Sequence, residues 1–234
     1  DPLAEKYYSI SPYAYCLNNP IRYIDPDGRD LINGDSATMA QAKQKLEEAE
    51  KIFNDKYDGN SKKKKKDFAS EGEWEKYRNE RKGYKKAKRD FNIAKYNYDE
   101  TQARIDFFKK TDSEGFAKID NLQIIINGKT IDVDVVVTNV LELKNPNAIG
   151  GYTYANSTDI PGTYTIFVQI ENNVKPYQDI LAHEFGHAFG IAKDPIGLSK
   201  INDPNIDCQN PSNWNHPQVK DAIEWQKKFN QGGN

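Results

Sequence analysis

Two of the chain's three histidines, His183 and His187, stand four residues apart, with Glu184 beside the first. Residues four apart on a helix project from one face, so both imidazoles can bind the same metal ion. Zinc accepts imidazole nitrogen readily, and a catalytic zinc site takes three protein ligands and a water. Glu184 is placed to act as general base on the zinc-bound water rather than as a ligand. The spacing therefore predicts Zn²⁺ as cofactor, His183 and His187 as metal ligands, and Glu184 as the catalytic residue.

The third metal ligand has two main candidates. Asp194 follows the motif closely enough for a small bulge to deliver its carboxylate. His216 is the one histidine outside the motif, and we favour it because neutral imidazole suits zinc well. Weaker candidates, from the loop-like tract between these two and from the final predicted helix, are Asp203, Asp207, Cys208 and Glu224. Candidates for stabilising the oxyanion of the reaction are Tyr152, Tyr154 and Trp214.

The residues around the motif predict the elements that position it. Pro176 suits the first position of a helix and Gly190 suits the glycine that ends one, so a helix is predicted over residues 176–190. Residues 163–170 are rich in β-branched and aromatic side chains and predict a strand just before that helix. We interpret this strand as a sheet edge, to which an extended substrate can add by backbone pairing.

The string HEFGHAFGIAKDP, residues 183–195, resembles the zinc-binding helix of metzincin-like metallopeptidases, whose pattern is H-E-x-x-H-x-x-G-x-x-H/D. The match covers both histidines, the glutamate and Gly190. Lys193 stands where the pattern has its third ligand, and no methionine follows Met39 to form the downstream Met-turn. The resemblance implies a zincin-like domain that hydrolyses peptide bonds in a protein or peptide substrate.

Residues 31–112 have the pattern of two helices. Asp35 or Ser36 can cap a first helix, whose apolar side chains recur every three to four residues. A second helix is predicted from about Glu71 to Lys110, and its heptad seam predicts a hairpin with the first helix. The seam residues are Tyr77, Tyr84, Ala87, Phe91, Ala94, Tyr98, Thr101, Ile105 and Phe108. Five consecutive lysines at 62–66 are followed at once by acidic residues, which indicates a solvated loop at the hairpin tip.

A β-hairpin is predicted after these helices. Asn127 and Gly128 separate two runs of β-branched residues, the strongest short-range signal for a two-residue turn. In the second run Ile131, Val133 and Val135 alternate with polar residues, as in a strand with one face in water. The fold class predicted from these elements is α+β, with a small mixed or antiparallel sheet and the motif helix.

The first 30 residues are rich in Tyr, Pro and Asn and contain strong turn signals. Residues 1–29, and above all the string NP-x-x-Y-x-DP-x-G at 19–28, resemble the closing signature of Rhs/YD-repeat core domains. In that family a variable C-terminal toxin follows the signature, enclosed by the repeat shell, and self-cleaving members usually have leucine where this chain has Arg29. The resemblance implies a toxin module, secreted or delivered from a bacterial cell as the C-terminal part of a larger protein. Its implied partners are the Rhs/YD-repeat shell and a cognate immunity protein.

Composition and charge set further limits. The chain has 234 residues and a formal net charge of −2, which gives no reason to expect a nucleic-acid partner. Its two cysteines cannot make a disulfide framework, and no apolar run is long enough for a transmembrane segment. Charge is uneven along the chain: residues 36–112 have 21 basic and 15 acidic side chains, whereas 113–234 have 9 and 14.

These observations predict three segments. Residues 1–30 are the end of an Rhs/YD-repeat core, 31–112 a helical hairpin or coiled-coil region, and 113–234 a zincin-like metallopeptidase domain. The function they predict is zinc-dependent metalloendopeptidase activity in the toxin module of an Rhs-type effector. The alternative hypothesis is a non-catalytic, zinc-stabilised interaction or delivery module that acts through its helical hairpin.

Overall fold

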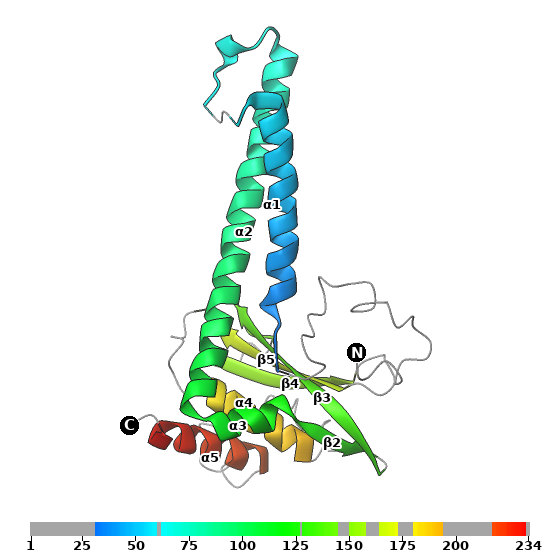
Figure 1. The fold of residues 1–234 in the computed structure, drawn as a ribbon, viewed down its shortest axis with the longest axis vertical. Coiled ribbons are helices and arrows are strands. Elements are labelled where there is room, and N and C mark those ends of the chain that lie inside the picture. Colours follow the sequence, from blue (N-terminus) through cyan, green and yellow to red (C-terminus); the bar gives the residue numbers. More distant parts are fainter. Residues whose placement is uncertain are drawn as a thin grey trace.

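The computed structural model describes residues 31–59, 62–126, 128–144, 150–157, 164–172, 180–193 and 217–232. They form a mixed α+β fold, in which a small sheet and three shorter helices make a body and two long helices project from it as a stalk (Figure 1). Residues 1–30, which resemble the end of an Rhs/YD-repeat core, lie outside the described residues. Within the described ranges, no helix is long and apolar enough to span a bilayer.

The stalk consists of α1 (Asp35–Tyr57) and α2 (Glu71–Thr111), joined at the tip through a short 3₁₀ helix, η3 (Lys65–Asp67). The predicted hairpin is confirmed, and α2 begins and ends within one residue of its predicted bounds. At the tip, Phe53 of α1 stacks on Tyr84 of α2 with 5.3 Å between ring centroids and contacts Tyr77 at 5.8 Å. This aromatic cluster is separate from the core of the body and holds the far end of the stalk together.

Asp35 ties the root of the stalk to the sheet. The sequence predicts Asp35 or Ser36 as the N-cap of α1, but Gly34 occupies that position and both predicted residues lie inside the first turn. The Asp35 carboxylate instead accepts hydrogen bonds from the Thr101 hydroxyl of α2 (2.6 Å) and from the Asn139 backbone N–H (2.8 Å). Burial raises the pKa of this carboxyl group, although both hydrogen bonds act in the opposite direction. One buried side chain thus links both stalk helices to the sheet.

The sheet has the strand order β1-β3-β5-β4, and β2 pairs with β3 as a hairpin. Its strands are β1 (Leu31–Asn33), β2 (Gln123–Ile126), β3 (Lys129–Val140), β4 (Gly151–Ser157) and β5 (Tyr164–Glu171). β1, β3 and β5 run parallel, and β4 is antiparallel to β5. The predicted two-residue turn is confirmed, because Ile126 pairs with Lys129 and Gly128 between them has φ +75°.

The prediction that the strand at 163–170 forms a sheet edge is wrong. β5 lies between β3 and β4 and pairs with both. The side chains on one face of β5 are all buried and most of those on its other face are half-buried. The edge position next to the motif helix belongs to β4, which the sequence pattern did not predict as a strand.

Three helices complete the body: α3 (Ser113–Asp120), α4 (Ile180–Lys193) and α5 (Pro217–Gly232). The C-terminal end of α2 packs into the hydrophobic core of the body, where the Phe108 ring lies 4.8 Å from the ring of Phe185 on α4. The predicted end of the motif helix at Gly190 is wrong. α4 continues to Lys193, because the residue after the glycine, Ile191, is fully buried in the same core. The predicted start at Pro176 lies outside the described residues.

Candidate metal centre

The two motif histidines lie on α4 with their Nε2 atoms facing each other. The distance from His183 Nε2 to His187 Nε2 is 3.2 Å, and the two rings are nearly perpendicular. Two nitrogens that bind one zinc ion at about 2.0–2.1 Å with tetrahedral angles lie about 3.3 Å from each other. The distance between the two histidine nitrogens therefore matches that of two ligands of a single zinc ion.

Gln226 of α5, which the sequence did not single out, orients the first histidine. The Nδ1–H group of His183 donates to Gln226 Oε1 at 3.1 Å. A proton held on Nδ1 leaves a lone pair on Nε2, the atom that faces His187. Metal-binding histidines generally make such a bond through their outer nitrogen, which fixes the ring and makes it a better ligand. Gln226 therefore acts as a positioning residue for the candidate metal centre.

A close approach of α4 and α5 brings Gln226 to the histidine. Gly186, inside the motif, faces α5 so closely that a Cβ atom there would lie 2.4 Å from the Ala222 Cα atom. Only glycine fits at that distance, so this position of the motif has a packing role. His183 and Gln226 are 43 residues apart in the chain, so no local pattern could have revealed their contact.

Glu184 is buried between α4 and the edge strand β4, with 4% of its surface exposed. The Thr153 hydroxyl of β4 donates to Glu184 Oε2 at 2.6 Å. Gly151 of β4 leaves room for the carboxylate, since a Cβ atom there would lie 2.6 Å from Glu184 Oε1. Burial raises the pKa of Glu184 to about 7, while the hydrogen bond from Thr153 acts in the opposite direction. A carboxyl group with a pKa near neutrality can both accept and return a proton.

The favoured candidates for the third ligand, Asp194 and His216, lie outside the described residues. The same is true of three weaker candidates, Asp203, Asp207 and Cys208. Lys193, at the ligand position of the metzincin pattern, donates to Asp221 of α5 at 2.7 Å and so ties the end of α4 to that helix. In the part of the chain that the structure describes, no group of three or more His, Cys, Asp or Glu side chains comes together. Among the described residues, the candidate ligands brought together are therefore His183 and His187.

Glu224, the last of the weaker candidates, does not lie at the histidines. Its carboxylate is exposed and lies 3.8 Å from the ammonium group of Lys220 on the same helix. The side of α5 that faces α4 has Ala222 and Gln226, each two residues from Glu224. Two residues correspond to more than half a turn of helix, so the glutamate points away from α4.

The two tyrosines proposed for oxyanion stabilisation also lie elsewhere. Tyr152 and Tyr154 stack on each other at 5.5 Å, and Tyr154 stacks on Phe167 of β5 at 5.2 Å. Side chains alternate along a strand, so both tyrosines lie on the sheet face opposite to Thr153, which faces α4. The third candidate, Trp214, lies outside the described residues.

Comparison with known proteins does not assign the chain to a family. No protein-family model, curated protein or solved structure matches it. Its function has to be inferred from the residues and the geometry described above.

Proposed function

We propose that the chain is a zinc-dependent metalloendopeptidase. The observation that carries this proposal is the placement of three side chains by one helix: the histidine Nε2 atoms 3.2 Å apart, and Glu184 buried beside β4. His183 and His187 would hold the zinc ion, together with Asp194 or His216. Zinc bound there would polarise the carbonyl group of the substrate and make a water molecule more acidic.

Glu184 would take the proton of the attacking water and return it to the leaving amine. Its position on the same helix as both histidines, next to His183, supports this role. The bond from Thr153 to Oε2 keeps the carboxylate in one orientation. A structural zinc site, which is closed by four protein ligands, has no need of such a glutamate.

An extended polypeptide is the substrate shape that best suits the sheet edge. β4 pairs with β5 on one side, and no described residue pairs with its other side. A peptide that hydrogen-bonds to the free backbone groups of β4 would run past Gly151 and Thr153, both of which contact Glu184. Backbone pairing does not depend on the side chains of the substrate, so sequence preference would come from other contacts.

The Glu184→Gln variant tests the proposal. We expect it to retain zinc, because Glu184 is not a ligand, and to lose cleavage of an unfolded protein substrate such as casein by at least about 100-fold. The matched control is Glu224→Gln, which changes an exposed glutamate on α5 and is expected to cleave like the unchanged chain. Full cleavage by Glu184→Gln, or zinc-loaded protein with no cleavage of any unfolded substrate, would contradict the proposal.

The biological setting is a separate part of the proposal. The resemblance of residues 1–29 to the end of an Rhs/YD-repeat core supports a role as the toxin module of a larger protein delivered from a bacterial cell. Expression of residues 31–234 inside bacteria is expected to stop growth, and the Glu184→Gln change is expected to abolish the effect. Equal toxicity of both forms would point to the alternative, a non-catalytic module.

A further inference from the structure

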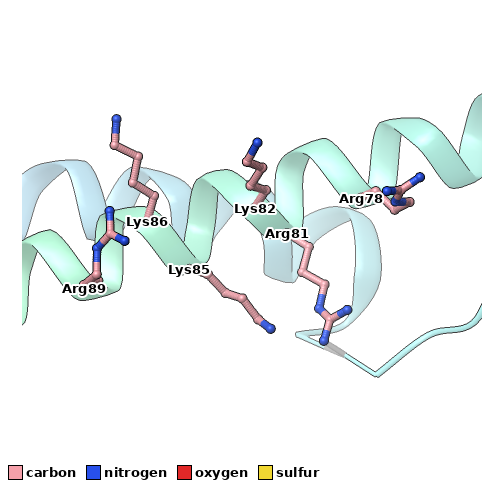
Figure 2. Close-up of a pocket in the computed structure, with 6 residues that line it drawn as sticks. All are labelled: Arg78, Arg81, Lys82, Lys85, Lys86 and Arg89. Atoms are coloured by element: carbon pink, nitrogen blue, oxygen red, sulfur yellow. The ribbon is translucent and has the colours of Figure 1, made fainter.

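One face of the stalk has a concentration of positive charge that the candidate metal centre does not use. Six side chains of α2 line a depression that is open to solvent, and Figure 2 shows how they lie along the helix. They are Arg78, Arg81, Lys82, Lys85, Lys86 and Arg89. Lys82 and Lys86 extend to one side in that view and Arg81 and Lys85 to the other. We call these six residues the basic face.

Neighbouring acids do not neutralise the basic face. Within the described residues, Arg89 is the one member with a carboxylate inside ion-pair distance, that of Asp90 at 3.6 Å. Some cations elsewhere on the stalk do form ion pairs, as Lys56 does with Glu80 at 2.8 Å. The lysines at 62–66 are also partly engaged, since Lys65 forms an ion pair with Glu71.

The spacing of the six cations destabilises α2, the helix on which they lie. Four pairs of like charges are spaced at i, i+4, which destabilises an α-helix, whereas opposite charges at that spacing would stabilise it. The pairs are Arg78 with Lys82, Arg81 with Lys85, Lys82 with Lys86, and Lys85 with Arg89. A surface that only had to be soluble would mix the two signs, as α1 does with Lys43 and Glu47. A run of like charges that opposes helix formation therefore indicates an anionic partner.

We propose that the basic face binds the phosphate backbone of a nucleic acid. From Arg78 to Arg89 the face extends about 16 Å along the helix, which matches about five successive phosphates of one strand at about 3.4 Å each. Three of the six cations are arginines, whose planar guanidinium groups bind phosphate oxygens in pairs. The stalk also holds this face away from the body, where residues 113–234 have more acidic than basic side chains and would repel a polyanion (Figure 1).

The surroundings of the face favour a nucleic acid over a lipid surface or an acidic protein. The large exposed apolar side chains of α2 are Ile93 and Tyr96, and both lie beyond the basic face toward the body. Membrane-bound helices insert apolar side chains among their cations, and protein interfaces depend on buried apolar or aromatic anchors. A face with cations alone suits a chain of phosphates. The overall charge of −2 hides this feature, because it averages the stalk with the acidic body.

The test is the binding of the full chain to a labelled 20-base-pair DNA duplex, measured by fluorescence anisotropy between 50 and 200 mM salt. If all six cations contact phosphates, a plot of the logarithm of the binding constant against the logarithm of the salt concentration should have a slope of about −5. Changing Lys82, Lys85 and Lys86 to Gln should weaken binding at least about tenfold and reduce the slope by about 3. The matched control changes Lys43, Lys45 and Lys51 of α1 to Gln, removes the same charge, and should bind nearly like the unchanged chain.

Three results would overturn the proposal. They are no duplex binding at 50 mM salt, equal loss of binding in both triple variants, or binding to phosphatidylserine vesicles without binding to DNA. Circular dichroism of each variant shows whether the stalk stays helical, which separates loss of contact from loss of structure. Peptide cleavage does not enter any of these measurements, so the outcome is independent of the proposed peptidase activity.

Discussion

The hydroxyl group of Thr153 donates a 2.6 Å hydrogen bond to the carboxylate of Glu184 and so joins the edge strand to the motif helix. Thr153 also lies 3.1 Å from the Glu184 backbone carbonyl oxygen, which places it against the helix itself. One threonine therefore holds together the strand proposed to bind the substrate and the residue proposed to act as general base.

Thr153→Val is expected to lower kcat/KM for peptide cleavage about 10- to 100-fold, because the carboxylate loses the donor that fixes its orientation. The zinc content should not change, since neither residue is a metal ligand. Thr165→Val, at a buried threonine of β5, is the matched control and should keep its activity. Loss of zinc from Thr153→Val would show that its role is structural rather than positioning.

Gly151→Ala should also reduce cleavage, on the order of 100-fold, because the new methyl group would lie within 3 Å of three Glu184 side-chain atoms and push the carboxylate aside. Gly83→Ala is a suitable control. Nothing lies within 4 Å of a Cβ atom there, so it should leave cleavage unchanged and stabilise α2 by about 0.5–1 kcal/mol. Steady-state kinetics and thermal unfolding of both variants measure these effects.

Gln226→Leu is expected to weaken zinc binding about 10- to 100-fold by removing the acceptor of the His183 Nδ1–H bond. Gln226→Glu retains an acceptor and should bind zinc at least as tightly as the unchanged chain. Gln231→Leu, at an exposed position of the same helix, is the control. Competition with a chromophoric chelator gives the zinc affinity of each of the three variants. Equal zinc affinities for all of them would show that Gln226 does not position His183.

Asp35 should make the stability of the fold depend on pH. Its pKa is raised in the folded state, mainly by burial, so the folded chain binds a proton more readily than the unfolded chain. The free energy of unfolding should therefore fall as pH rises through the interval above 3.8, the ordinary pKa of the group. Asp35→Asn keeps an oxygen that can accept from Thr101 and Asn139 but cannot ionise. Urea unfolding at pH 4 and pH 7 should show that the unchanged chain gains stability relative to this variant at the lower pH. Asp55→Asn, on the exposed side of α1, is the matched control variant.

Local sequence patterns determined much of the fold. The heptad seam of α2 predicts its length and its pairing with α1 because helical periodicity needs only neighbouring residues. The turn at Gly128 follows in the same way from two residues and the strands that flank them. The spacing of His183 and His187 likewise places their nitrogens together, since four residues complete about one helical turn. The two nitrogens of the candidate metal centre were thus evident from five consecutive residues.

The tertiary structure alone decided what surrounds those five residues. β4 became the sheet edge in place of β5, because strand order depends on pairing between segments far apart in the chain. Thr153 and Gln226 contact the motif from 31 and 43 residues away, and a single sequence has no periodicity that links such positions. The basic face of α2 is not one of these tertiary features, because its six cations recur at helical spacing within residues 78–89. Patterns within a helix or a strand are encoded locally, whereas the partners of its side chains are fixed only when distant segments pack together.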